Sequence, residues 1–549
     1  MLWILLPKPA FWGLDNGIKY QGSRAFAETG KIALTYDGVD FDAKGGFRPI
    51  AAPFSEMHNG KQIPTFPPLF MLIGGIFYLV MGRWGPFLLP LIGGWLTLLA
   101  SWLLWQRQRG DRDGRFFLLI VGLGTPILFY SLELWEHSLT AGFLTLSIMF
   151  TCAQHRIHRS QRYLEVFLGG IFFALAVSMR SELLLWGCVT LLLWPLTGHS
   201  LRTSIYYLFG AFTVILLVML LNYWQTGYPI PQHISANFLE YGPRSLYTLI
   251  VSRMQNVYKL LLEGFPANHW SMLGVIPLLM VGLWSGWRYE EDWWMGVGAA
   301  VLAAWGVYFY QAVTAANVIA YTAVSGGLLW TAPMTALVLL PFKGERRRFW
   351  KFLWYGSALF IVLTAAIAPS IHGIHWSQRL LVPILPVMMM IAATRGQRWW
   401  RRYPHVKPVI ILFLIISIVG QVFSYVSLQT AHRQNAALNR WVTITGAEVT
   451  ITPMWWLAGD CALVSYNQPW YLIRRNDQLP QVLQGLRERG VKQAVYIENQ
   501  PYLKPELWWS LGVERQDDDH FFGGDRRLRK TRLKIIGTPK ATAPSAAPD

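Results

Sequence analysis

The sequence predicts an α-helical membrane protein with about twelve or thirteen transmembrane helices and a small α/β domain outside the membrane. Three observations predict this class. Of the 549 residues, 53% are hydrophobic and only 14% are charged, whereas a soluble domain carries roughly 25% charged residues. Apolar runs long enough to cross a bilayer recur from residue 86 onward. Lys and Arg gather in alternate connections between these runs. Such a composition excludes a cytosolic globular, a disordered and a fibrous protein.

The apolar runs define the predicted membrane bundle, residues 86–428. There are twelve of them, near 86–106, 116–132, 138–154, 163–179, 183–197, 204–225, 270–287, 293–312, 322–341, 352–369, 380–394 and 408–428. The net charge of +18 lies mainly between these runs, so it indicates membrane orientation rather than nucleic-acid binding. Three cysteines are too few for a disulfide framework or a Cys-rich zinc site.

The basic connections predict the orientation of the bundle. Short loops rich in Lys and Arg stay in the cytoplasm. The loops at 107–115, 155–162, 342–351 and 395–407 have this composition, and the loops between them do not. The alternation is self-consistent across all twelve runs. It places residues before 86, residues 226–269, residues 370–378 and the chain after 429 on the outer side.

Residues 1–85 are expected to form a first outer loop with juxtamembrane helices. Residues 1–13 are apolar but too short to span, so a first span is reduced or lies upstream. A short amphipathic helix is expected to end at Gly30. Leu69 to Met81 has only about 13 residues, too few for an ordinary span. We therefore expect it to be an interfacial or re-entrant helix that begins at Pro67 and Pro68.

The chain after residue 429 changes composition and predicts a small outer α/β domain over 429–524. The expected elements are strands at 448–453, 471–474 and 492–498 and a helix at 479–489 capped by Gly490. Residues 525–549 are basic and then rich in Pro and Ala, which predicts a disordered tail.

Polar residues in the outer loops are the candidates for chemistry. Ionisable groups at the membrane face are a functional hypothesis by default, and an arginine fork binds phosphate oxygens in pairs. The candidates are Asp15, Lys61, Glu133, Glu136, His137, Arg180 beside Glu182, His375 and Arg379. Structural alternatives remain open: Asp15 as a helix N-cap, residues 130–138 as a water-exposed loop, Arg180 and Glu182 as a local ion pair, and Arg379 as an interfacial anchor.

Four of these segments, in order, carry a resemblance to a known family. They are Asp15 with the helix to Gly30, Phe66-Pro-Pro-Leu-Phe70 with Gly82, Leu132-Glu-Leu-Trp-Glu-His-Ser-Leu-Thr-Ala, and Gln378-Arg-Leu-Leu-Val-Pro-Ile-Leu-Pro386. Over roughly residues 10–430 the chain resembles the GT-C superfamily of membrane glycosyltransferases. The nearest branches are those similar to protein O-mannosyltransferases (glycosyltransferase family 39) and to lipid A aminoarabinose transferases. The resemblance implies inverting transfer of a hexose or pentose from a polyprenyl-phosphate donor, at the outer face of a bacterial inner or plasma membrane.

The resemblance also implies roles for individual residues. Asp15 matches the first-loop acid that acts as base toward the acceptor or helps hold a metal, and Glu136 matches the second acid. Arg379 matches the arginine proposed to bind the lipid phosphate, and Lys61 resembles a further donor-phosphate contact. Glu133, His137, His375 and Arg180 are additional candidates.

A divalent metal, Mg²⁺ or Mn²⁺, is a possible cofactor under this resemblance. Besides Asp15, the pair Asp40 and Asp42 has the spacing of a metal-binding Asp-x-Asp motif. The expected partners are the polyprenyl-phosphate sugar donor and membrane lipids, with the acceptor a protein, a lipid or a glycan.

Other classes of function remain open on the sequence alone. A transporter or flippase of lipid-linked sugars shares spans and basic loops, but intramembrane charges or paired broken helices are typical of that class. A polymerase or ligase of lipid-linked glycans would carry its large outer loop late in the chain. A non-catalytic membrane scaffold would leave Asp15, Glu136 and Arg379 scattered.

Overall fold

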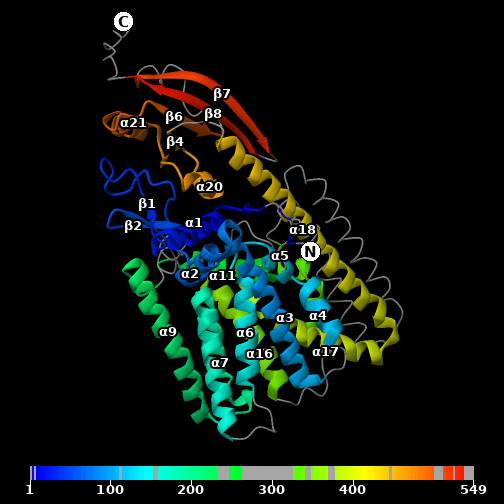
Figure 1. The fold of residues 1–549 in the computed structure, drawn as a ribbon. Coiled ribbons are helices and arrows are strands. Elements are labelled where there is room, and N and C mark those ends of the chain that lie inside the picture. The colour runs from blue at the N-terminus through cyan, green and yellow to red at the C-terminus, as the bar shows by residue number, and fades with distance from the viewer. Residues whose placement is uncertain are drawn as a thin grey trace. The chain divides into compact units, whose positions relative to one another are not determined.

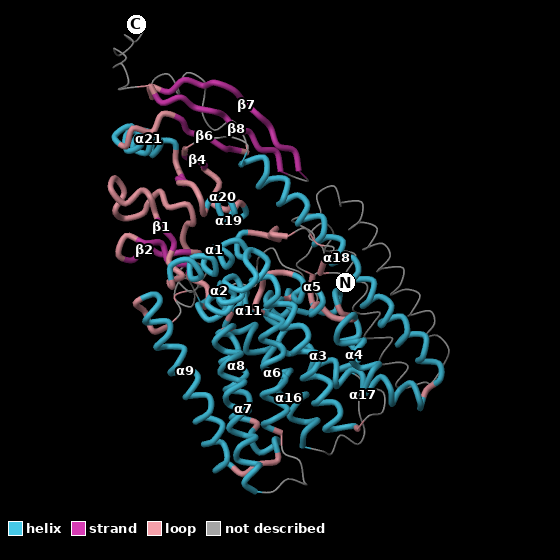
Figure 2. Tube along the Cα trace, viewed as in Figure 1, coloured by secondary structure: helices cyan, strands magenta, loops and turns pink. Residues whose placement is uncertain are grey.

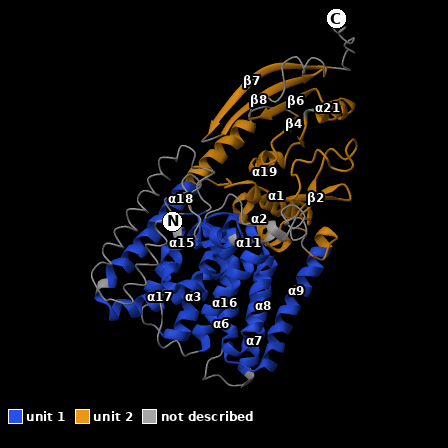
Figure 3. Cartoon of the chain, turned by 180° about the vertical axis from the view of Figure 1, so that it is seen from behind, with its two compact units in different colours: residues 1–3, 87–223, 237–428 blue, residues 4–86, 224–236, 429–549 orange. Residues whose placement is uncertain are grey.

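The computed structural model describes residues 3–4, 6, 8–110, 114–152, 159–230, 232, 246–261, 326–339, 348–368, 377–443, 448–499, 511–523 and 526–536. The chain divides into two compact units (Figure 3). Unit 1 comprises residues 1–3, 87–223 and 237–428, and unit 2 comprises residues 4–86, 224–236 and 429–549. Every described strand belongs to unit 2, and Figure 2 draws these strands in magenta.

Unit 1 is built from helices that pack side by side (Figure 1). Its α-helices are α3 (Leu88–Arg109), α4 (Gly114–Leu123), α5 (Ile127–Leu132), α6 (His137–Thr151), α7 (Arg159–Met179), α8 (Leu184–Leu192), α9 (Ser204–Thr226), α11 (Leu246–Leu261), α15 (Leu328–Thr331), α16 (Arg348–Ile367), α17 (Leu385–Arg402) and α18 (Lys407–Thr443). The last residues of α9 and α18 belong to unit 2. Short 3₁₀ helices join them, namely η2 (Ser181–Leu183), η3 (Trp194–Thr197), η4 (Leu201–Thr203), η6 (Pro333–Leu339), η7 (Arg379–Ile384) and η8 (Pro404–Val406).

Six helical segments in the described part of the chain are long and apolar enough to cross a membrane. They are Pro68–Arg109, Gln161–Met179, Leu201–Thr226, Arg348–Ile367, Arg379–Arg402 and Lys407–Thr443. A bilayer core of about 30 Å needs roughly 20 helical residues. The predicted class, a multi-pass helical membrane protein, is therefore confirmed.

Several predicted apolar runs are interrupted where the sequence holds proline. The run at 116–132 forms two helices, α4 and α5, because Pro126 disfavours the helical conformation of the residue before it. The run at 183–197 forms α8 and then η3, which begins at Trp194-Pro195. Within 322–341, Pro333 separates α15 from η6. The runs at 270–287 and 293–312 lie outside the described residues.

The first segment of unit 2 contains two helices and a small sheet. Helix α1 (Leu14–Thr29) ends at Gly30, whose φ of 74° is the left-handed conformation that glycine adopts easily. The predicted helix end is thus confirmed. Strands β1 (Leu34–Thr35), β2 (Ser55–His58) and β3 (Lys61–Pro64) form an antiparallel sheet of order β1-β3-β2, which the sequence did not predict.

Helix α2 (Pro68–Met81) follows the small sheet and begins at its prolines, as expected. Its 14 residues rise about 21 Å, less than the bilayer core. The 3₁₀ helix η1 (Gly82–Phe87) then leads directly into α3. The interfacial or re-entrant placement of α2 stays a prediction.

The C-terminal part of unit 2 holds a five-stranded sheet of order β5-β4-β6-β8-β7. Its elements are β4 (Val449–Thr452), α19 (Leu457–Asp460), α20 (Ala462–Ser465), β5 (Trp470–Leu472), η9 (Asn476–Gln478), α21 (Leu479–Glu488), β6 (Gln493–Glu498), β7 (Val513–Gly523) and β8 (Arg526–Ile535). The strands β5, β4 and β6 are parallel, and β8 and β7 add an antiparallel hairpin. Helix α21 packs its apolar stripe into the core with Ile451 and Tyr471.

The end of the sheet differs from the expected boundary at residue 524. Residues 526–535, expected to belong to a disordered tail, form β8 between β6 and β7. Acidic side chains of β7 compensate the basic side chains of β8: Asp519 pairs with Lys530 at 3.0 Å, and Glu514 pairs with Lys534 at 3.6 Å. Opposite charges on neighbouring strands stabilise such pairing.

Candidate active site

A buried ion-pair cluster lies at the amino end of α6 in unit 1. Glu136 is the residue before α6, and its Oε1 accepts a hydrogen bond from Arg180 Nη1 at 3.1 Å. Glu182 Oε1 accepts a second bond, from Arg180 Nε, at 2.6 Å. The Glu136 side chain is only 3% exposed. Two carboxylates thus hold one guanidinium, and the amino end of α6 favours the negative charge of Glu136.

Helix packing brings these residues together from distant parts of the sequence. Helices α6 and α7 pack against each other as consecutive, oppositely directed elements, so the start of α6 meets the end of α7. Arg180 directly follows α7. The start of α6 is held against α3, where Thr97 Oγ1 donates to the Ser138 carbonyl at 2.7 Å. A Cβ on Gly93 would lie 2.5 Å from the Leu139 nitrogen, so only glycine permits this close approach.

Aromatic side chains enclose the cluster. Tyr130 on α5 stacks on His137, with ring centroids 4.4 Å apart, and Trp135 lies 5.5 Å from Tyr130. Tyr130, Glu133 and His137 are fully buried. An arrangement of charges among aromatic faces strengthens electrostatic interactions, because water is excluded.

Arg379 belongs to the same unit and faces the same region. It begins η7, which packs against α6. Its charge acts on Tyr130, as does that of Arg180. The preceding residue, Gln378, is 1% exposed, and neither atom of its amide has a hydrogen-bond partner in the described residues. Buried polar atoms are nearly always satisfied, so an unpartnered amide beside an arginine indicates a place for a polar ligand.

The structure thus places Glu133, Glu136, His137, Arg180 and Arg379 in one unit, and it links Glu136 to Arg180 directly. Arg180 and Glu182 form the local ion pair that the sequence left open, but Glu136 joins it. The sequence analysis did not single out Gln378 or Tyr130 as site residues. Gln378 directly precedes Arg379, and Tyr130 lies just before the Glu133–His137 segment, so these positions in the sequence could have indicated them. His375 lies outside the described residues.

Asp15 and Lys61 belong to unit 2. Asp15 is half-buried in the first turn of α1. It is not the N-cap, which is Gly13, whose N–H donates to the Asn16 side chain at 3.2 Å. Lys19 lies one turn further along the same helix face. Lys19 is buried with its ammonium 4.9 Å from the Phe66 ring centroid, and it is a charged neighbour that the sequence analysis missed. Lys61 is exposed at the start of β3.

A second buried ion pair lies in unit 2, between Asp460 and Arg526. Arg526 Nη2 donates to Asp460 Oδ2 at 2.6 Å, and the guanidinium covers the Trp456 ring at 4.3 Å. The Asp460 backbone carbonyl accepts bonds from Asn435 at 2.8 Å and Asn439 at 3.0 Å. Burial raises the pKa of the Asp460 carboxyl, Arg526 opposes this shift, and the nearby charge of Asp15 adds to it.

The Asp40 and Asp42 carboxylates already have protein partners. Asp42 accepts hydrogen bonds from Tyr36 Oη at 2.6 Å and from the Gly46 and Phe47 nitrogens at 2.9 and 2.7 Å. Asp40 pairs with Arg489 at 2.7 Å. These two residues therefore organise the loop and do not fit a shared metal ion. In the described part of the chain, no group of three His, Cys, Asp or Glu side chains converges.

Comparison with solved structures identifies the fold. The chain is similar to the apo structure of ArnT, an aminoarabinose transferase from Cupriavidus metallidurans. The two sequences are 13% identical, the match covers 97% of this chain and 96% of the ArnT chain, and the TM-score is 0.52. The same enzyme bound to undecaprenyl phosphate is 12% identical, covers 99% and 97%, and has a TM-score of 0.53. The chain has the GT-C fold. No family model matches the chain, and no curated protein matches its sequence.

The GT-C fold extends over nearly the whole chain, so the likeness includes both the helical unit and the C-terminal sheet. The predicted fold class and the resemblance are thereby confirmed. Because the identity is so low, the likeness carries no residue roles. The roles of Asp15, Lys61, Glu136 and Arg379 are argued from this chain alone.

Proposed function

We propose that the protein is an integral-membrane glycosyltransferase that transfers a sugar from a polyprenyl-phosphate donor to an acceptor at the outer face of the membrane. Two findings support this proposal. The chain has the GT-C fold, and a solved structure of that fold, ArnT, holds undecaprenyl phosphate. The outer-face orientation rests on the alternation of Lys and Arg between the spans.

The observation that carries the proposal is the group formed by Arg379, Gln378 and the Glu136–Arg180 cluster. Arg379 supplies a permanently charged fork suited to phosphate oxygens. The buried amide of Gln378 supplies donors that have no partner in the described residues. The buried aromatic side chains of Tyr130 and Trp135 enclose this group and exclude water from it.

The transfer needs a base and a stabilised leaving group. In the proposed step, Asp15 accepts the proton of the acceptor hydroxyl as the hydroxyl oxygen bonds to the anomeric carbon. The bond between that carbon and the donor phosphate breaks, and the phosphate leaves with the electron pair. Arg379 neutralises the leaving charge. Attack opposite to the leaving phosphate in one displacement inverts the anomeric configuration.

Glu136 has a different role in this proposal. As a buried carboxylate bonded to Arg180, it holds the guanidinium in one geometry beside Tyr130. Glu182 holds the same guanidinium from its other side. Glu136 is therefore a positioning residue for the cationic side of the site. Since Asp40 and Asp42 do not fit a metal ion, the proposal contains no step through one.

A transfer assay with matched variants tests the proposal. Purified protein is supplied with a polyprenyl-phosphate-linked sugar and acceptor, and product is quantified. Asp15→Asn keeps the shape but removes the base, so we expect the rate to fall about 10²–10⁴-fold. Asp37→Asn is the control, because Asp37 is an exposed carboxylate in a turn of the same unit.

The alternatives predict other results in this assay. Full transfer by Asp15→Asn would contradict the assignment of Asp15 as base. Movement of the intact donor between the leaflets of a vesicle, without product, would identify a flippase. If the protein neither transfers the sugar nor moves the donor, the non-catalytic scaffold becomes the better hypothesis.

A further inference from the structure

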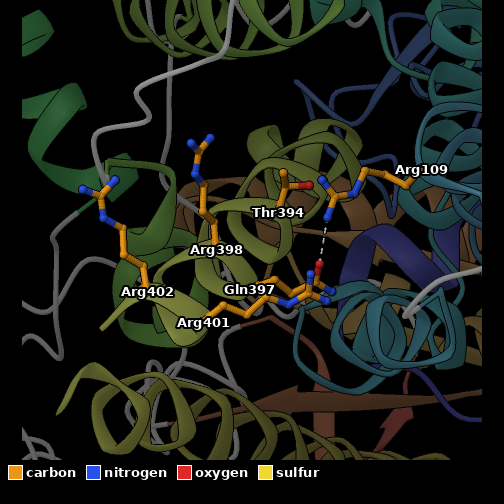
Figure 4. Close-up of a pocket in the computed structure, with 6 residues that line it drawn as sticks. All are labelled: Arg109, Thr394, Gln397, Arg398, Arg401 and Arg402. Carbon is orange, nitrogen blue, oxygen red and sulfur yellow. Dashed lines mark hydrogen bonds between the residues drawn. The ribbon is translucent and has the colours of Figure 1, made fainter. Parts of the chain in front are cut away.

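A basic cavity lies between α3 and α17 in unit 1 (Figure 4). It has a volume of about 460 Å³ and is lined by Arg109, Thr394, Gln397, Arg398, Arg401 and Arg402. We refer to these six residues as the arginine pocket. The proposed transfer uses none of them.

Helical spacing explains how the pocket is assembled. Thr394, Gln397, Arg398 and Arg401 recur at intervals of three or four residues, which places them on one face of α17. Arg398 and Arg402 extend in the same direction from α17 (Figure 4). Arg109, at the end of α3, reaches across and donates to Gln397 Oε1 at 3.0 Å. Like charges three or four residues apart on a helix repel one another.

The floor of the pocket contains donors that lack partners. Thr394 is 2% exposed, and its hydroxyl has no hydrogen-bond partner in the described residues. The same holds for the buried Nε2 of Gln397. None of the six lining side chains carries a carboxylate. A cavity in which every polar side chain can donate, and in which buried donors are unsatisfied, is complementary to an anion.

The position of the pocket along α17 indicates where that anion lies. Arg379 precedes the amino end of the helix, and the pocket is at its carboxyl end, about 27 Å away for 18 helical residues. This distance is close to the thickness of a bilayer core. Trp399, Trp400 and Tyr403 surround the carboxyl end, and Lys407 lies over Trp400. Trp and Tyr are enriched at membrane–water interfaces.

We propose that the arginine pocket binds the phosphate of an anionic phospholipid headgroup, on the membrane face opposite Arg379. Arginine forks pair with phosphate oxygens at two points, and basic pockets between spans at the membrane surface bind such headgroups. The aromatic girdle and the end of a span favour a lipid over a free phosphate. By the orientation expected from the basic loops, the lipid belongs to the inner leaflet. The inference does not depend on glycosyl transfer.

Native mass spectrometry of the purified full-length protein in neutral detergent, titrated with phosphatidylglycerol, tests this proposal. We expect Arg398→Gln/Arg402→Gln to bind phosphatidylglycerol at least about tenfold more weakly than the unmodified protein, because two charge-assisted contacts are lost. Arg474→Gln/Arg475→Gln is the matched control. It removes the same charge from exposed positions of unit 2 and should bind normally. Arg398→Lys/Arg402→Lys should bind with intermediate affinity.

A second variant keeps the test independent of the arginines. Thr394→Val removes only the buried hydroxyl and should weaken binding severalfold without changing the charge. Equal binding by the unmodified protein, Arg398→Gln/Arg402→Gln and Thr394→Val would overturn the proposal. Equal binding of phosphatidylcholine would overturn the anionic specificity. If millimolar inorganic phosphate fully displaces phosphatidylglycerol, the pocket binds a soluble phosphate instead of a lipid. If polyprenyl phosphate binds in preference to phosphatidylglycerol, the pocket binds the donor lipid.

Discussion

Two buried carboxylate–arginine pairs, one in each unit, have the same chemistry but different surroundings. Glu136 and Arg180 lie 3.1 Å apart in unit 1, and Asp460 and Arg526 lie 2.6 Å apart in unit 2. Both carboxylates are 3% exposed. Burial and distance alone therefore do not separate a structural pair from a functional one.

The residues around the two ion pairs differ. Arg526 pairs with Asp460 and covers the Trp456 ring, and it joins the start of β8 to α19. Arg180 has two carboxylates, and its charge acts, together with that of Arg379, on the buried Tyr130. Gln378 adds donors without partners in the described residues. A pair that joins two elements of unit 2 indicates a structural role, whereas a pair that lies near a second arginine and the buried amide of Gln378 indicates a ligand site.

The largest expected effect is the loss of stability when the Asp460–Arg526 pair is broken. Arg526→Gln leaves the Asp460 carboxylate buried without its cation, which typically costs about 3–5 kcal/mol. We expect a clearly lower melting temperature for the purified protein.

Arg489→Gln is the control for this prediction. It breaks an ion pair with Asp40 whose carboxylate is 81% exposed, and exposed pairs contribute about 0–1 kcal/mol. Equal melting temperatures for Arg526→Gln and the unmodified protein would contradict the structural role of the Asp460–Arg526 pair.

The second effect concerns the other pair. Glu136→Gln keeps the size of the side chain but weakens its hold on Arg180, and a misplaced cation costs about 10²-fold in rate. We expect transfer to fall by this factor while the melting temperature changes less than in Arg526→Gln. If Glu136→Gln instead lowers stability and leaves transfer per folded molecule intact, then the two pairs have the same structural role.

The smallest effect is a pH dependence of stability. Burial raises the pKa of Asp460 in the folded protein, while an unfolded Asp titrates near about 3.9. The folded state therefore binds this proton more readily, and the stability that the group contributes is full below pH 4 and is lost as pH rises through the folded pKa. The melting temperature of the unmodified protein should fall more between pH 4 and pH 7 than that of Asp460→Asn. Parallel pH profiles would show that burial does not perturb this carboxyl.

Run lengths and the change of composition after residue 429 were enough to predict the helical membrane class and strands near the C-terminus. The breaks at Pro126 and Pro333 were not predicted, because hydropathy averages over a proline that ends a helix. Strand β8 was missed since its basic composition resembles that of a disordered tail. Only pairing with the acidic residues of β7 explains how Lys530 and Lys534 are accommodated.

The site was predictable in part. The alternation of basic loops placed Glu136, Arg180 and Arg379 at one face, and in the structure Glu136 and Arg180 pair directly. No sequence pattern indicates that the Gln378 amide has no hydrogen-bond partner among the described residues, because satisfaction of a buried amide depends on packing between helices far apart in the chain. The N-cap hypothesis for Asp15 was wrong because the helix begins at Leu14 and its N-cap is Gly13, two residues earlier.

The most direct test of the central claim is the affinity of the purified protein for a polyprenyl phosphate. Arg379→Gln should weaken binding at least about tenfold, because a hydrogen bond to a charged group contributes about 1.5–3 kcal/mol. Arg398→Gln/Arg402→Gln, at the opposite end of α17, should bind polyprenyl phosphate like the unmodified protein. Unchanged affinity in Arg379→Gln, or loss of affinity only in Arg398→Gln/Arg402→Gln, would contradict a donor-phosphate site at Arg379.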